Sequence, residues 1–328
     1  MKGLILGAGN GSRLQPFSQL KPKVLLPVMN RPMIGYCIDK LAELELKEIG
    51  IVIQSRHEKL FRDEIGTGRR WGVSITYIFQ DQLLGVADAV KQASSFIGDD
   101  SFLLLLGDNL IEQPLTALRD AVVRDGHNAS ILLGPVASPQ EYGIAEVVNH
   151  RIVSLEEKPL HPKSNLAIVG AYAFGPTVFR AIDTLSPSVR GEFEITDAIG
   201  AMIRLGDSVS YCITTQKHLD MGRHERWLEA NRWMLKLSQE ARRKAAMAKY
   251  KGCTFIEPVA IAENCKLEGC IIGPNVTVGP NVELTQCLIA NSIVLEGTHL
   301  TMSSHSSSII SPIATFSLRN GGGSDWTS

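Results

Sequence analysis

A glycine-rich stretch with basic residues follows the first apolar run of the chain. Gly7, Gly9 and Gly11 alternate in "GAGNGSRLQPFSQLKPK", which also contains Arg13 and Lys23. Glycines after a strand let backbone N–H groups approach an anion, and a helix start adds a favourable dipole. Arginine supplies a planar fork for phosphate oxygens, and lysine a compact positive charge. The stretch predicts a phosphate site, and a tight turn with exposed charges is the alternative for this segment alone.

The spacing excludes two common phosphate motifs. The dinucleotide fingerprint GxGxxG requires a third glycine where this chain has Ser12. The ATPase loop GxxxxGK[ST] fails as well, because Ser12 and Arg13 follow Gly11. A phosphate site here is therefore of another kind.

An acidic residue stands at the end of another apolar run. Asp108 lies in "GDN", directly after "FLLLL". Hard cations prefer carboxylate oxygens, and a turn or helix cap is the equally open alternative for this residue alone. A zinc site is not indicated, because His218 and His224 lack the HExxH spacing. The six cysteines show no CxxC pair, so we expect free buried thiols.

Short apolar runs that alternate with helix-period segments must position these groups. From residue 1 to about 215 the runs are "GLIL", "IGIVI", "ITYIF", "FLLLL" and "ASILL". Between the first two, "PMIGYCIDKLAEL" carries a helical stripe, and Pro32 suits a first helical turn. The pattern predicts an α/β fold with a Rossmann-like, mostly parallel sheet flanked by helices. Ligands of such sheets bind beyond the carboxyl ends of the strands.

The end of the chain predicts three further parts. Residues 223–252 are rich in helix formers and predict a connecting helix. From 253 to 312, aliphatic residues recur in two registers, and Ile261, Val278 and Leu295 are 17 residues apart. This rhythm predicts a short left-handed β-helix of hexapeptide repeats, with roughly three coils, and such stacks often assemble chains into homo-oligomers. Residues 313–328 predict a flexible tail.

The composition is that of an ordinary globular protein. Of 328 residues 44% are hydrophobic, and 33 Lys and Arg balance 34 Asp and Glu. No global charge favours nucleic acid or an anionic membrane, and no run reaches the roughly 20 apolar residues of a membrane span. We expect a cytoplasmic protein that binds neither.

Several ordered motifs together resemble one family. After the opening stretch come "FQDQLLGVADAV", "LLLLGDN", "EYGIAEV", "LEEKP", "VGAYAF", "RGEFEITDAI" and "LDMGRHERWLEANR". The series, over residues 1 to about 235, resembles the sugar-1-phosphate nucleotidylyltransferases, and the repeat region resembles that of their longer members. "RGEFEITDAI" is most similar to the glucose-1-phosphate thymidylyltransferases, although neighbouring subfamilies share much of the rest.

The resemblance implies a reaction, a metal and a catalytic domain over residues 1–222. A sugar 1-phosphate oxygen attacks the α-phosphorus of a nucleoside triphosphate, dTTP or UTP, with Mg²⁺ as cofactor, and pyrophosphate leaves. The implied catalytic residues are Arg13, Lys23, Asp108 and Asp220, and the two aspartates would hold the metal. The implied nucleotide-binding residues are Gly7, Gly9, Gly11, Ser12, Gln80 and Gly85. The implied sugar-phosphate-binding residues are Tyr142, Gly143, Glu157, Lys158, Val169 and Arg190.

Three alternatives stay open. The chain could make a UDP-sugar, or be a catalytically silent regulatory or scaffold relative. A bifunctional enzyme with an acyltransferase β-helix is the third, with His299 as the candidate base before the serine-rich end of the chain. The chain also departs from the family pattern at Phe17, Ser18 and His218 and has "DMG" in place of the commoner "DTG", but none of these changes removes a charged group.

Overall fold

The computed structural model describes residues 1–238, 250–318 and 324–327. The chain forms two compact units that do not follow linear order. Unit 1 comprises Met1–Asn10 and Met33–Leu219, and unit 2 comprises Gly11–Pro32 and Asp220–Ser328. The boundary predicted at residue 222 therefore has to be corrected, because Gly11–Pro32 belongs to the same unit as the C-terminal region.

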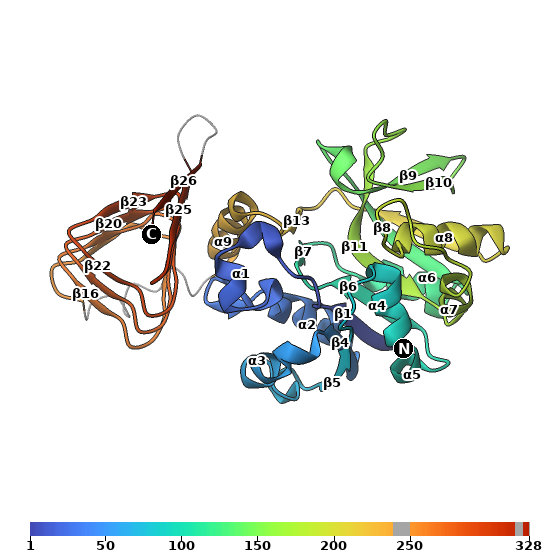
Figure 1. Cartoon of the computed structure of the whole chain (residues 1–328), viewed down its shortest axis with the longest axis horizontal. Helices are drawn as coiled ribbons and strands as arrows, with labels where there is room; N and C mark the ends of the chain where they lie inside the picture. The colour runs from blue at the N-terminus through green and yellow to red at the C-terminus, as the bar shows by residue number, and fades with distance from the viewer. Residues whose placement is uncertain (239–249, 319–323, 328) are drawn as a thin grey trace. The chain divides into compact units, whose positions relative to one another are not determined.

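Unit 1 is built on one mixed sheet of nine strands (Figure 1). Its strands are β1 (Lys2–Leu6), β4 (Glu48–Ile53), β5 (Ser74–Phe79), β6 (Phe102–Leu106), β8 (Ala129–Pro135), β9 (Gly143–Val148), β10 (Arg151–Glu157), β11 (Leu166–Phe174) and β12 (Val209–Ile213). The order is β10-β9-β11-β6-β1-β4-β5, with β8 beside β11 and β12 beside β8. The strands β5, β4, β1 and β6 are mutually parallel, whereas β11 runs antiparallel to β6, β8 and β9. The predicted Rossmann-like sheet is confirmed, and its parallel part carries the glycine stretch.

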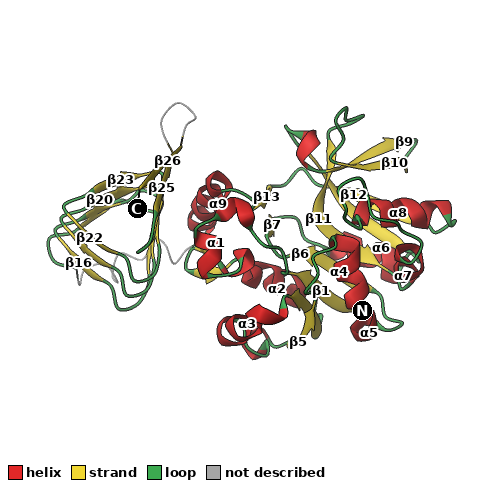
Figure 2. Ribbon diagram, viewed as in Figure 1, coloured by secondary structure: helices red, strands yellow, loops and turns green. Residues whose placement is uncertain are grey.

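Helices cover both faces of this sheet (Figure 2). They are α2 (Ile34–Glu43), α3 (Glu58–Glu64), α4 (Val86–Gln92), α5 (Ser94–Ile97), α6 (Thr116–Val123), α7 (Thr177–Ile182) and α8 (Ile195–Arg204). Leu4 and Leu104 pack into a core that contains residues of α4, α7 and α8. Gly3 points to the opposite face, where a Cβ on it would lie 2.7 Å from Leu41 of α2. Burial on both faces explains why these strands are continuously apolar.

The predicted first helix begins later than its sequence suggests. Pro32 lies in a short hairpin of β2 (Pro27–Val28) and β3 (Arg31–Pro32), and α2 starts at Ile34. Met29 and Asn30 take positive φ angles of 49° and 59° in the hairpin turn. Because Pro32 pairs with Pro27 across this hairpin, it does not begin the helix.

An aromatic core explains why Gly11–Pro32 belongs to unit 2. This segment includes α1 (Phe17–Leu20) and lies against α9 (His224–Leu237). Phe17 and Trp227 are fully buried, with ring centroids 5.6 Å apart in an edge-to-face arrangement. Trp227 Nε1 donates a hydrogen bond to Pro27 O at 2.7 Å. Of the helix predicted over 223–252, only α9 forms, and it ends at Leu237 because Ser238 takes an extended conformation. Residues 250–252 form a turn and not a helix, and residues 239–249 lie outside the described residues.

The C-terminal region is a parallel β-helix with three sheets (Figure 1). The first sheet contains β14 (Thr254–Phe255), β17 (Ile271–Ile272), β20 (Leu288–Ala290) and β23 (Ser304–Ser306). The second contains β15 (Val259–Ile261), β18 (Val276–Val278), β21 (Ile293–Val294) and β24 (Ser308–Ile310). The third contains β16 (Lys266–Glu268), β19 (Glu283–Thr285) and β22 (His299–Thr301). Leu267 pairs with Leu284, and Ile272 with Ile289, so the 17-residue coil is confirmed at these positions.

Two details of the predicted β-helix have to be corrected. Val278 pairs with Val294 rather than with Leu295, because the turn before Ile293 is one residue shorter than the turn before Val276. The segment predicted as a flexible tail contains β25 (Thr315–Leu318) and β26 (Ser324–Thr327), which extend the second sheet as antiparallel strands. Phe316 is 2% exposed and stacks on the His224 ring at 4.4 Å between centroids, which anchors β25.

The cysteines are free, as predicted, but only three of the six are fully buried. All six cysteines are free, and Cys37, Cys270 and Cys287 are buried. Burial, together with the nearby charge of Asp108, raises the pKa of the Cys37 thiol. Among the described helices, none combines the length and hydrophobicity required to cross a bilayer.

Candidate functional site

The glycine stretch begins where β1 ends, and a buried glutamine braces it. Gly7 N donates to Val52 O at 2.8 Å, so this N–H continues the sheet and is already engaged. Gln54, at the carboxyl end of β4, donates from Nε2 to Ala8 O and, at 3.0 Å, to Asn10 Oδ1. The loop is thereby held over the parallel part of the sheet. Gly9 lies exposed within it.

The loop after β5 contains the predicted base-reading residues. Gln80 is 5% exposed, and its Nε2 donates to Gly85 O at 3.1 Å and to Asp88 Oδ2 at 2.7 Å. Gly85 has φ 112° and ψ 177°, a conformation that is essentially restricted to glycine. A Cβ on Gly85 would lie 2.6 Å from Phe193 O.

Two backbone hydrogen bonds join this loop to the predicted sugar-phosphate loop. Phe193 N donates to Leu84 O at 2.7 Å, and Ala87 N donates to Phe193 O at 3.0 Å. Phe193 lies in "RGEFEITD", three residues after Arg190. The structure therefore brings the Gln80 loop and the Arg190 loop together within unit 1.

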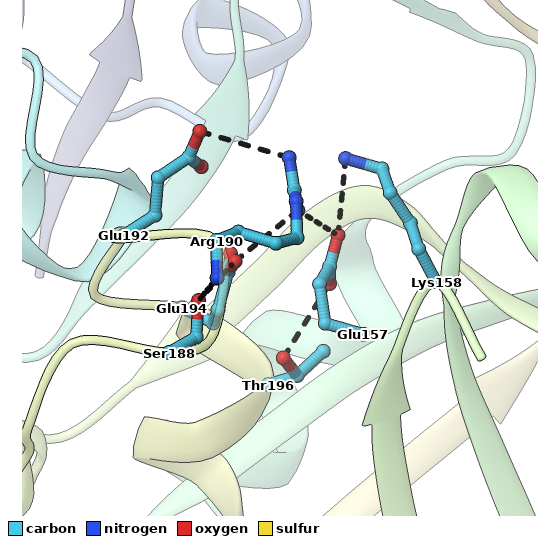
Figure 3. A network of polar contacts seen from close by, with 7 residues as sticks. All are labelled: Glu157, Lys158, Ser188, Arg190, Glu192, Glu194 and Thr196. Atoms are coloured by element: carbon cyan, nitrogen blue, oxygen red, sulfur yellow. Dashed lines mark hydrogen bonds and ion pairs between the residues drawn. The ribbon is translucent and has the colours of Figure 1, made fainter.

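Lys158 and Arg190 converge on one carboxylate (Figure 3). Lys158 Nζ lies 3.4 Å and Arg190 Nη1 3.6 Å from Glu157 Oε1. Arg190 Nη1 also lies 3.1 Å from Glu194 Oε1, and Thr196 Oγ1 donates to Glu157 Oε2 at 3.4 Å. Two cations from separate loops thus share an acidic, half-buried centre, where an anionic group of a ligand could pair with them.

The backbone around this centre is unusually constrained. Lys158 has a positive φ of 45°, which is uncommon for a residue with a side chain and often marks a functional position. Lys158 N donates to Tyr142 O at 3.0 Å, which ties the lysine to the start of β9. Gly143 pairs with Glu157 across β9 and β10, and a Cβ on it would lie 2.9 Å from Glu157 Oε2. A larger residue at 143 would displace the carboxylate.

The Glu194 carboxyl group has a shifted pKa. Its burial is the main cause, and the neighbouring Glu157 carboxylate adds to it, so the pKa of Glu194 is raised above its usual range. Arg190 opposes the shift. Glu194 therefore contacts Arg190 from a site where burial disfavours its ionised form.

Asp108 follows β6, as predicted, on the same edge of the sheet as Gly7. Asn109, the first residue of β7 (Asn109–Ile111), donates from Nδ2 to Val169 O at 3.1 Å. β7 pairs with β13 (His218–Asp220), the last residue of which is Asp220. Among the described residues, no group of three or more His, Cys, Asp and Glu side chains could hold a metal ion.

The other predicted charges lie in unit 2. Gly11 has a positive φ of 61°, and a Cβ on it would lie 2.8 Å from Lys23 Cβ. Asp220 Oδ1 accepts a hydrogen bond from Gly222 N at 3.1 Å. A Cβ on Gly222 would lie 2.9 Å from Asp220 Oδ1 and 4.0 Å from Arg13 Nη1. Unit 2 therefore groups Arg13 with Asp220 and places Lys23 beside Gly11, while Ser12 begins the 3-10 turn Ser12–Leu14.

Several residues that shape these loops were not predicted from the sequence. They are Asn10, Gln54, Asp88, Glu194 and Thr196. Gln54 could have been predicted as a site residue from its position. It is the first polar residue after the apolar run "IGIVI", just as Asp108 is the first polar side chain after "FLLLL". His299, the candidate base of an acyltransferase, is 66% exposed and lies 3.7 Å from Glu283 Oε2 on the outside of the β-helix.

Comparisons with known proteins bear on this arrangement. The chain matches the family model for nucleotidyl transferases over residues 2–236. It is 40% identical over 236 residues to the low-salt glycan biosynthesis nucleotidyltransferase Agl11 of Haloferax volcanii, and 39% identical over 240 residues to a glucose-1-phosphate thymidylyltransferase of Streptomyces antibioticus. Each match covers 72% of this chain and 66% of the relative, slightly less than two thirds of its length.

Two further similarities widen the comparison. The UTP–glucose-1-phosphate uridylyltransferase AglF of Haloferax volcanii is 32% identical over 225 residues, which are 68% of this chain and 91% of AglF. A solved structure from Bacillus anthracis, assigned as a glucose-1-phosphate thymidylyltransferase and in complex with sucrose, aligns with a TM-score of 0.67 at 35% identity. That alignment covers 70% of this chain and 94% of the other. The chain therefore belongs to the nucleotidyl transferase family, among sugar-1-phosphate nucleotidyltransferases.

Proposed function

We propose that the chain joins glucose 1-phosphate and dTTP to give dTDP-glucose and pyrophosphate. One observation carries this proposal. Lys158 and Arg190 converge on Glu157, and the loop of Arg190 is hydrogen-bonded to the loop of Gln80. A pair of cations suits a sugar phosphate, a carboxylate suits sugar hydroxyls, and a buried amide suits the edge of a base. The thymidylyltransferase relatives support this choice of substrates.

The nucleophile needs no protein base. A phosphate monoester has a second pKa near 6, so its oxygen is ionised at pH 7. The obstacle is mutual repulsion between two polyanions, and the remedy is in-line positioning with neutralisation of the charge on the leaving oxygens. Lys158 and Arg190 would hold the sugar phosphate, while Glu157 would accept hydrogen bonds from the sugar. Tyr142, Gly143 and Val169 would line the sugar with backbone groups.

The triphosphate would be held by the opening stretch. Arg13 and Lys23 would bind phosphate oxygens, with Gly9, Gly11 and Ser12 allowing close approach of the backbone. Because Gly7 N–H is engaged by Val52 O, we propose that Gly7 contributes by shaping the loop and not by donating to the ligand. Gln80 and Gly85 would contact the base.

Asp108 and Asp220 would hold a divalent cation, which we propose to be Mg²⁺. Mg²⁺ is usually bound by one or two carboxylates together with substrate phosphates and water, and not by an all-protein cage. When bound, the cation would neutralise phosphate charge.

A uridylyltransferase is the second candidate, and the similarity to AglF favours it. Thymine and uracil share the edge that Gln80 would read and differ by one methyl group. A pocket discriminates one methyl group by only about 1–3 kcal/mol, so packing at the base decides between them.

A substrate panel tests the proposal. Pyrophosphate release is measured with four hexose 1-phosphates against dTTP, UTP, GTP and ATP. We expect the highest kcat/KM with glucose 1-phosphate and dTTP. Higher kcat/KM with UTP would establish the second candidate, and no release with any pair would contradict both and favour a silent relative.

Assembly and location stay predictions. We propose a homo-oligomer formed through the β-helix and a cytoplasmic location, without binding to nucleic acid or membranes. Light scattering after gel filtration tests the assembly, and a mass equal to one 35.8 kDa chain would contradict it.

A further inference from the structure

The Gln80 side-chain amide is held in one orientation. Its Nε2 donates to Gly85 O at 3.1 Å and to Asp88 Oδ2 at 2.7 Å. An amide nitrogen carries two hydrogens, and both are therefore engaged. In the reversed orientation, Oε1 would face a carbonyl and a carboxylate with no proton between them. The electrostatic repulsion of these acceptors disfavours that orientation.

Asp88 is the stronger of the two acceptors. Hydrogen bonds to an ionised carboxylate are roughly twice as strong as those between neutral groups. Asp88 lies in the first turn of α4, and its other oxygen, Oδ1, accepts from Gln92 Nε2 at 3.2 Å. This second bond fixes the carboxylate, which in turn fixes the glutamine.

The remaining atom of the amide faces outward. Within the described part of the chain, Gln80 Oε1 accepts no hydrogen bond. It is also absent from the fully buried polar atoms without a partner, so this oxygen keeps some exposure to solvent. Since the residue as a whole is only 5% exposed, this oxygen is the part of Gln80 that a ligand can reach. The loop therefore presents one hydrogen-bond acceptor and no donor from this side chain.

This polarity selects between bases. Thymine and uracil carry a ring N3–H donor, whereas N3 of cytosine is an acceptor whose lone pair would face the Oε1 lone pair. We propose that Asp88 is the positioning residue that makes the chain select thymine or uracil over cytosine, by holding the Gln80 carbonyl toward the base. The inference rests on the proposed function, in which Gln80 contacts the base, and it adds a residue outside the predicted site.

The test measures nucleotide binding and needs no turnover. Calorimetry with Mg²⁺ gives the Kd values of dTTP and dCTP for the full chain, for Asp88→Ala and for Asp88→Asn. The control is Lys91→Ala, which removes an exposed partner of Asp183 from the same helix. We expect the chain to bind dTTP at least about tenfold more tightly than dCTP, and Asp88→Ala to reduce this ratio about tenfold, since a flipped amide then pairs with cytosine N3.

The conservative variant separates positioning from a structural role. The side chain introduced by Asp88→Asn keeps a carbonyl oxygen that can still accept from Gln80, so this variant should keep most of the ratio, as should Lys91→Ala. A purely structural role would weaken both nucleotides equally and leave the ratio unchanged in Asp88→Ala. That result would overturn the inference, and so would equal losses in the Ala and Asn variants or a similar loss in the control.

The outcomes distinguish this inference from the proposed function. The expected binding ratios without formation of any nucleotide-sugar would contradict the function and leave the role of Asp88 supported. Turnover with an unchanged ratio in Asp88→Ala would contradict the role of Asp88 alone. If neither nucleotide binds, both are wrong.

Discussion

Replacing Gly85 by alanine should disconnect the Gln80 loop from the Arg190 loop. At φ 112° and ψ 177° an alanine is strained by about 1–3 kcal/mol. Its Cβ would lie 2.6 Å from Phe193 O and 2.8 Å from Phe193 N, the two atoms that hydrogen-bond to Ala87 N and Leu84 O. Losing both bonds costs about 0.5–1.5 kcal/mol each.

Together these effects amount to about 2–6 kcal/mol against the observed loop conformation. Because the loop can open without global unfolding, most of this cost should be seen in kcat/KM and not in Tm. At 1.36 kcal/mol for each factor of ten, we expect kcat/KM for pyrophosphate release to fall at least about 30-fold.

Gly72 provides a matched control. It also has a positive φ, 68°, but among the described residues no atom beyond its chain neighbours lies within 4 Å of the position that its Cβ would take. Gly72→Ala should therefore cost only the left-handed strain, about 1–2 kcal/mol of unfolding free energy, and leave kcat/KM unchanged. Wild-type kcat/KM in Gly85→Ala, or equal losses in both variants, would refute the role assigned to the clash with Phe193.

Three further predictions concern the metal, the second unit and a shifted carboxyl group. Asp108→Asn should abolish metal-dependent pyrophosphate release with an unchanged Tm, and retained activity would contradict the assignment of Asp108 as a metal ligand. Trp227→Ala should lower the unfolding free energy in urea by about 3–5 kcal/mol, because it empties the fully buried site beside Phe17; a loss below about 1 kcal/mol would show that this contact does not organise unit 2. Burial raises the pKa of Glu194 above its ordinary 4.5, so with rising pH this carboxyl group ionises in the unfolded chain before it ionises in the folded chain. Its contribution to stability therefore declines as the pH rises through its folded pKa. Wild type should therefore lose stability relative to Glu194→Gln between pH 4 and pH 7, and a pH-independent difference in urea unfolding would be the contrary result.

Local patterns predicted much of unit 1 and of the β-helix. Each apolar run forms a strand. Burial on both faces explains the continuous hydrophobicity of β1, β4, β6 and β8, whereas the edge strand β5 is only partly buried. The coil rhythm of the β-helix follows from side chains that stack inward. The register slip to Val294 was not predictable, since Ile293, Val294 and Leu295 are all apolar and either register places an apolar side chain inward. The strands after residue 313 are held in part by the contact of Phe316 with His224, a residue far away in the chain, and composition does not reveal such a contact.

The candidate site shows the same division. Residues at strand ends, such as Asp108, are visible in sequence because polarity changes there abruptly. Asp88 and Glu194 cannot be recognised from the sequence in this way. Their roles come from contacts with Gln80 and Arg190, and only the folded backbone sets the orientation of these partners. The assignment of Gly11–Pro32 to unit 2 likewise depends on Trp227, a residue far away in the chain.

The proposed function requires groups from separate loops to contact one nucleotide-sugar. A crystal structure of the chain with dTDP-glucose and Mg²⁺ tests it most directly. We expect one ligand molecule, with Gln80 Oε1 on the base N3, Lys158 and Arg190 on phosphate oxygens, and Glu157 on sugar hydroxyls. A ligand that binds away from these four side chains, or a base that turns away from Gln80 while the sugar stays at Glu157, would contradict the account.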